Sequence, residues 1–205
     1  MQFARVNDIT IHHQVIGGPA EKPVLVFVNS LGTDFRIWRD VIVGLAGDAP
    51  LLTYDKRGHG LSDVGQVPYS IDDHVSDLIG LLETLSVRKA VICGLSVGGM
   101  IALGLAARRP DLVSGLILCD TAHKIGTAES WNARIKAVEE NGLGSIVDAV
   151  MERSRFVHNG RDQTVPQAPS VFSSWNGWSK AVAVAEARST WLSPSTERRV
   201  TMPWR

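Results

Sequence analysis

A serine between closely spaced glycines is the residue of this chain best suited to chemistry. Residues 94–99 are Gly-Leu-Ser-Val-Gly-Gly, which fits the pattern Gly-x-Ser-x-Gly. This pattern is typical of a serine nucleophile on a sharp turn from a strand into a helix, because glycines allow the turn without a Cβ clash. Ser96 is therefore the candidate nucleophile. The alternative is an ordinary corner whose serine only caps the helix.

Serine attack on a carbonyl produces an oxyanion, which two backbone N–H groups must stabilise. One donor follows the nucleophile, which here is Val97, and the other comes from the loop after an earlier strand. Residues 29–33, Asn-Ser-Leu-Gly-Thr, follow an apolar run, so the N–H of Leu31 is the candidate second donor. The alternative is that this loop is a plain strand-to-helix connection.

Apolar runs and helical periodicity predict the elements that must position these groups. Continuous apolar runs predict buried strands, and apolar stripes at helical spacing predict surface helices. Strands are expected over 2–6, 9–16, 23–29, 50–54, 89–93 and 113–119, and helices over 35–45, 70–85, 100–109 and 127–153. Ser70 and Asp73 have the spacing of a capping box. The alternation predicts an α/β fold with a mainly parallel sheet and flanking helices.

Length and composition exclude several classes of protein. The 205 residues are enough for one domain, and the formal net charge of zero gives no support for binding nucleic acid or an anionic membrane. Cys93 and Cys119 lie in predicted strands, so we expect buried small hydrophobes without a disulfide or a metal. The N-terminus lacks the pattern of a signal peptide, and no apolar run approaches a membrane span. These features predict a soluble, cytoplasmic protein.

The character of the chain changes near residue 154. Residues 154–205 hold seven basic and three acidic side chains, four of the six tryptophans, one leucine and no isoleucine. Such a segment is too poor in Leu and Ile to extend a buried parallel sheet. Only residues 180–190 have a weak helical pattern. We expect an incomplete core over 1–153, with lid helices from about residue 127. The tail over 154–205 is expected to be atypical: aberrant, as after a frame shift, or disordered, or else genuinely divergent.

Four segments resemble the α/β-hydrolase superfamily, and within it the 3-oxoadipate enol-lactonases. They are Asn-Ser-Leu-Gly-Thr-Asp at 29–34, Asp-Lys-Arg-Gly-His-Gly-Leu-Ser at 55–62, Gly-Leu-Ser-Val-Gly-Gly at 94–99 and Cys-Asp-Thr-Ala at 119–122. The resemblance covers residues 1–153. It implies hydrolysis of the enol-lactone ring to 3-oxoadipate, in bacterial breakdown of protocatechuate and catechol, without a metal or organic cofactor. The alternatives are another esterase or a perhydrolase, and a catalytically inactive, vestigial protein.

The family places its triad in the order Ser, Asp, His, with the acid and the histidine on strands beyond the lid. No matching Asp and His are found here: His158 precedes Asp162, and no later histidine exists. The resemblance therefore implies a fold truncated after the sixth strand and the start of the lid. Without its base, a serine hydrolase retains only about 10³–10⁴-fold acceleration over water.

Two histidines are candidates for a substitute base. His123 follows the strand that ends near Asp120, and His158 begins the tail, so these two are the candidates. Asp120 fits a structural residue at a strand end better than a triad acid. The resemblance implies that His59 shapes its loop. His74, in the first turn of a helix, is expected to be solvated.

The substrate that the resemblance implies carries a carboxylate arm, which a cation near the lid would suit. Lys124 and Arg134 lie in that region, and Trp131 could wall the pocket. The alternatives are solvated surface charges for the two cations and a lid-packing role for the tryptophan. The predicted partner is thus a small lactone or ester, with no nucleic acid and no membrane.

Overall fold

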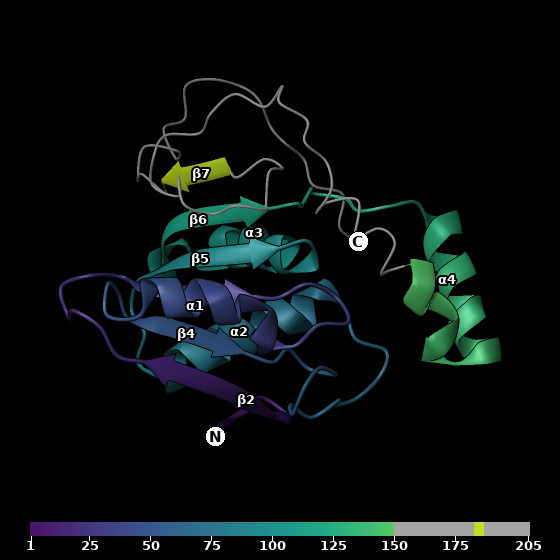
Figure 1. Ribbon diagram of the computed structural model, residues 1–205, viewed down its shortest axis with the longest axis horizontal. Helices are drawn as coiled ribbons and strands as arrows, with labels where there is room; N and C mark the ends of the chain where they lie inside the picture. Colours follow the sequence, from purple (N-terminus) through teal and green to yellow (C-terminus); the bar gives the residue numbers. More distant parts are fainter. Residues whose placement is uncertain (150–182, 187–205) are drawn as a thin grey trace.

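A seven-stranded sheet organises the protein in the computed structural model, which describes residues 1–149 and 183–186 (Figure 1). The strand order is β1-β2-β4-β3-β5-β6-β7. The strands are β1 (Gln2–Val6), β2 (Ile9–Ile16), β3 (Val24–Val28), β4 (Leu51–Tyr54), β5 (Ala90–Leu95), β6 (Val113–Cys119) and β7 (Ala183–Glu186). The four central strands β4, β3, β5 and β6 are parallel, so their carboxyl ends meet at one edge. The expected α/β fold is confirmed.

The helices are η1 (Phe35–Trp38), α1 (Arg39–Leu45), α2 (Ile71–Thr84), α3 (Val97–Arg108), η2 (Pro110–Leu112), α4 (Ala128–Asn141) and η3 (Leu143–Ile146). Of these, η1 and α1 pack on one face of the sheet, and α2 and α3 pack on the other. Alternate residues of β3 point to opposite faces: Val26 packs in the core shared with α2 and α3, and Phe27 packs with η1 and α1. This burial on both faces explains why the central strands are continuous apolar runs. Both cysteines are buried, as expected.

The amino-terminal hairpin and the start of α2 match the predictions closely. β1 pairs with β2 in antiparallel fashion about a turn at Asn7, which has a positive φ of 51°. Ser70 caps α2 by accepting from the Asp73 N–H, and the Asp73 carboxylate accepts from the Ser70 N–H. Within the described residues, no helix is both long and apolar enough to cross a membrane.

Two helical predictions need correction. The helix expected over 127–153 ends at Asn141, because Gly142 adopts a φ of 75° and the chain turns into η3. Residues Ala183–Glu186, within the weak helical pattern at 180–190, form β7 against β6. As a strand, this segment hydrogen-bonds to the backbone of Gly115–Leu118 in β6. A helix would leave those backbone groups unpaired at the edge of the sheet. The rest of the predicted tail, including His158, lies outside the described residues.

α4 stands apart from the sheet, on the far side of the segment that follows β6 (Figure 1). Thr127 caps it through a reciprocal pair of hydrogen bonds with Ser130, and none of its residues is buried. Its packing in the described part of the chain is mainly with η3. A helix therefore begins at residue 128, close to the expected start, and it is exposed; its role as part of a lid stays a prediction.

Candidate active site

Ser96 lies between the last residue of β5 and the first of α3, at the carboxyl edge of the sheet. Its backbone has φ 54° and ψ −118°, a conformation that a side chain rarely adopts and that costs about 1–3 kcal/mol. The Ser96 N–H donates to the Cys119 carbonyl at 2.9 Å, which ties the turn to β6. The serine side chain makes no capping hydrogen bond to α3. The geometry thus does not support the alternative of a simple helix cap.

Two glycines make this tight turn possible. A Cβ at Gly94 would lie 2.4 Å from the Gly98 carbonyl oxygen, and a Cβ at Gly98 would lie 2.1 Å from the Val28 carbonyl oxygen. Both contacts are with backbone atoms, which cannot swing away as a flexible side chain can. The first turn of α3 therefore packs directly against the ends of β3 and β5. The same Gly98 Cβ would lie 3.0 Å from the Asn29 oxygen, so the loop 29–33 adjoins the start of α3.

The two candidate oxyanion donors lie on these adjoining segments. Val97 is the first residue of α3, where an N–H has no acceptor within the helix. Leu31 is 44% exposed, and its N–H donates to no acceptor among the described residues. The structure therefore brings together the segments of Ser96, Val97 and Leu31. Their roles in catalysis stay predictions.

The loop that carries Leu31 is held from the segment that follows β4. The buried ammonium of Lys56 donates to the carbonyl oxygens of Asn29 at 3.0 Å and Ser30 at 2.9 Å. The Thr33 hydroxyl donates to the same Ser30 oxygen at 2.9 Å. Sequence reasoning missed Lys56, although a lysine directly after an apolar strand is a signal that could have singled it out.

His59 holds the same loop from a second point. Its Nδ1 lies 2.9 Å from the Arg57 carbonyl oxygen, and its Nε2 accepts from the Gly32 N–H at 3.0 Å. These two bonds require a neutral ring with its proton on Nδ1. Burial, together with the nearby Lys56 ammonium, lowers the pKa of His59. With both nitrogens engaged, His59 is suited to shaping the loop and not to serving as a base.

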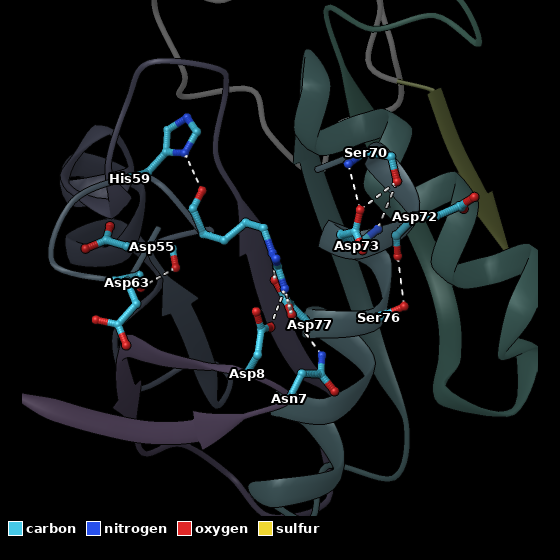
Figure 2. A network of polar contacts seen from close by, with 12 residues as sticks. Asn7, Asp8, Asp55, His59, Asp63, Ser70, Asp72, Asp73, Ser76 and Asp77 are labelled. Atoms are coloured by element: carbon cyan, nitrogen blue, oxygen red, sulfur yellow. Dashed lines mark hydrogen bonds and ion pairs between the residues drawn. The ribbon is translucent and has the colours of Figure 1, made fainter. Parts of the chain in front are cut away.

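A buried ion pair lies beneath His59 (Figure 2). The Arg57 guanidinium donates to both oxygens of Asp77, at 2.6 and 2.8 Å, and to Asp8 at 3.1 Å. Asn7 donates to Asp77 at 2.8 Å, so the turn between β1 and β2, the loop after β4 and helix α2 share one network. The hydrogen bonds with Asp77 raise the pKa of Arg57 further, which keeps it charged.

The expectation of a solvated His74 is wrong. Its side chain is buried, with the Tyr69 ring edge-on at 5.3 Å and the His59 ring at 6.5 Å. The loop before α2 folds over the first turn of the helix and excludes water. Burial lowers the pKa of His74 to about 4, and the positive charge of Lys56 adds to this effect.

The candidate base His123 makes no hydrogen bond to Ser96 in the described part of the chain. His123 is exposed on the segment after β6, and no histidine nitrogen there is hydrogen-bonded to the Ser96 hydroxyl. Asp120 is exposed and has a φ of 43° at the end of β6. His158 lies outside the described residues, and those residues contain no cluster of His, Cys, Asp or Glu able to hold a metal ion.

In the described residues, none of the three predicted substrate contacts is hydrogen-bonded to Ser96. Lys124 is exposed. Trp131 donates from its indole nitrogen to the Ile125 carbonyl at 2.6 Å, and the Arg134 guanidinium lies 5.0 Å above the Trp131 ring. Trp131 and Arg134 are thus engaged with their own segment. A hollow of about 760 Å³, whose lining includes Val24 and Lys89, lies at the opposite edge of the sheet.

Comparisons with known proteins agree with this architecture. Residues 23–141 match a family described as the alpha/beta hydrolase fold. Two 3-oxoadipate enol-lactonases of Acinetobacter baylyi are similar to this chain. One is 37% identical over 72% of this chain and 55% of its own length, and the other is 38% identical over 67% and 52%. The chain spans about half the length of these curated relatives.

A solved structure adds to this likeness. The enol-lactonase from Burkholderia xenovorans superimposes with a TM-score of 0.70 at 37% identity, covering 74% of this chain and 59% of that one. The resemblance of the amino-terminal portion to enol-lactonases, predicted from four short segments, is confirmed.

Proposed function

Because this chain belongs to the alpha/beta hydrolase family, we propose that it derives from a carboxylic-ester hydrolase whose nucleophile is Ser96. The observation that carries this proposal is the conformation of Ser96, with φ 54° and ψ −118° and a hydroxyl free of any capping bond. A strained backbone at a residue with no structural duty for its side chain is typical of a functional site. We further propose 3-oxoadipate enol-lactone as the substrate, since the curated relatives carry that name.

In the proposed reaction the Ser96 Oγ attacks the lactone carbonyl carbon and gives its proton to a base. The Leu31 and Val97 N–H groups stabilise the oxyanion. Collapse of the intermediate breaks the ring C–O bond, and the enol oxygen takes up a proton. Water then hydrolyses the acyl-enzyme, which releases the second carboxylate and restores Ser96.

The base is the component that the described residues do not supply in contact with Ser96. His123 and His158 are the two candidates within this chain. Lys124 and Arg134 are the proposed cations for the carboxylate arm, and Trp131 the proposed wall of the pocket. Localisation in the cytoplasm and a place in the catabolism of aromatic compounds belong to the same proposal.

Labelling with a fluorophosphonate, followed by peptide mapping, tests the nucleophile. We expect label on Ser96 in the wild type and none in Ser96→Ala. Ser86→Ala is the matched control, because Ser86 also has a positive φ, of 57°, and is an exposed serine outside the site. Absence of label on Ser96 would support a catalytically inert protein instead.

Hydrolysis of the enol-lactone, measured beside simple aryl esters, tests the substrate. A working base predicts Ser96-dependent turnover with a preference for the enol-lactone. A rate limited to about 10³–10⁴-fold over water would indicate that no base reaches Ser96. Faster hydrolysis of the aryl esters would favour a general esterase.

A further inference from the structure

Lys56 is a fully buried lysine whose ammonium contacts the loop of the candidate oxyanion donor. It follows β4, is 1% exposed, and donates to the carbonyl oxygens of Asn29 and Ser30. Burying an ammonium is costly unless it is paired and hydrogen-bonded. The hydrogen-bond partners of Lys56 in the described residues are these two loop carbonyls. The cost of burying the ammonium is therefore offset only when the loop is in this position.

The contact with Ser30 determines where the next N–H points. The Ser30 carbonyl and the Leu31 N–H belong to one planar trans peptide, in which the C=O and N–H bonds point in opposite directions. With the Ser30 oxygen held on Lys56 and the Thr33 hydroxyl, the Leu31 N–H must point away from Lys56. If this peptide flipped, a carbonyl oxygen would replace the N–H, and a carbonyl repels an oxyanion.

We propose that Lys56 is a positioning residue for the proposed hydrolase reaction: its ammonium fixes the Ser30–Leu31 peptide in the orientation that presents the Leu31 N–H. This inference rests on the proposed function for its catalytic consequence. Thr33 holds the same carbonyl as a weaker, neutral donor. His59 fixes the next N–H, that of Gly32, so the loop is held at consecutive peptides.

The charge of Lys56 makes this arrangement sensitive to pH. Burial lowers the pKa of Lys56 to about 7, and the carboxylate of Asp55 partly opposes that shift. His59 and His74 also lie in its electrostatic field, and both are held neutral by burial. A charged donor makes a stronger hydrogen bond than a neutral amine. The peptide is therefore held most firmly below about pH 7.

Lys56→Met removes the charge and keeps the length of the side chain. Because the variant removes the buried ammonium and leaves the Ser30 oxygen bonded to the Thr33 hydroxyl, we expect it to fold. We expect kcat for Ser96-dependent hydrolysis to fall about 10–100-fold with KM within about threefold, less than the loss of a whole oxyanion donor. Lys89→Met, at an exposed lysine, is the control and should match the wild type.

Two further measurements distinguish a role of Lys56 in positioning the Ser30–Leu31 peptide from a role in stabilising the fold alone. When Lys56 is already Met, Thr33→Val should lower kcat further, while Thr33→Ser, which keeps the hydroxyl, should not. The decline of wild-type kcat above about pH 7 should be absent in Lys56→Met. Equal kcat in Lys56→Met and the wild type would overturn the proposal.

An amide measurement keeps this test independent of turnover. In the Ser96→Ala background, which cannot form an acyl-enzyme, the Leu31 amide resonance and its exchange rate report the orientation of the peptide. We expect both to change in Lys56→Met and not in Lys89→Met. If hydrolysis is absent but the Leu31 amide changes, the proposed function fails and the orienting role of Lys56 stands. An unchanged amide refutes that role.

Discussion

Replacement of Ser96 by glycine should stabilise the protein relative to replacement by alanine. Both changes remove the hydroxyl, but only glycine removes the Cβ that makes φ 54° and ψ −118° unfavourable. That conformation costs a residue with a Cβ about 1–3 kcal/mol. Glycine avoids this cost, but it destabilises the folded state by about 0.5–1 kcal/mol because the unfolded chain has more freedom. Ser96→Gly should therefore exceed Ser96→Ala by about 1 kcal/mol in the free energy of unfolding.

Urea unfolding followed by circular dichroism measures this difference. The urea concentration at the midpoint of unfolding should be higher for Ser96→Gly than for Ser96→Ala, and the dependence of stability on urea concentration should be the same. The matched control is the same pair of substitutions at Ser76, in the middle of α2. There Ser76→Ala should be more stable than Ser76→Gly by about 1 kcal/mol, because glycine disfavours a helix. Equal midpoints for Ser96→Gly and Ser96→Ala would refute the argument that the turn stores strain.

Two further predictions concern the network under the site. Because burial lowers the pKa of His74 from 6.5 to about 4, the unfolded chain binds the extra proton first, and stability falls as pH drops from 6.5 to 4. Between these pH values the loss in the free energy of unfolding is about 3 kcal/mol, and His74→Phe should lose that much less in urea titrations at each pH. Parallel plots of stability against pH for the wild type and His74→Phe would exclude this role of His74. Asp77→Ala should cost about 3–5 kcal/mol, because it leaves Arg57 buried without its main partner. Asp8→Ala, at a half-exposed partner, should destabilise the protein much less than Asp77→Ala, and similar losses in the two variants would contradict this account.

The elements that depend on near neighbours could be predicted from the sequence. The hairpin over 2–16, the capping box of Ser70 and Asp73, and the strand before Ser96 all lie where expected. Apolar periodicity and helix caps involve residues only a few positions apart, so their signal is present in a short window. The pattern around Ser96 belongs to this class, and its setting between a strand and a helix followed from it.

The features that depend on distant contacts could be decided only by the tertiary structure. Lys56 meets Asn29 and Ser30 across 27 and 26 positions of the chain, and His74 is buried by residues outside its own helix. β7 forms because the edge of β6 offers unpaired backbone groups, which no pattern in residues 183–186 reveals. By itself the sequence indicated Ser96 as the candidate nucleophile. Only the fold decided which side chains hold the groups around it, because burial and hydrogen-bond partners arise when remote segments pack together.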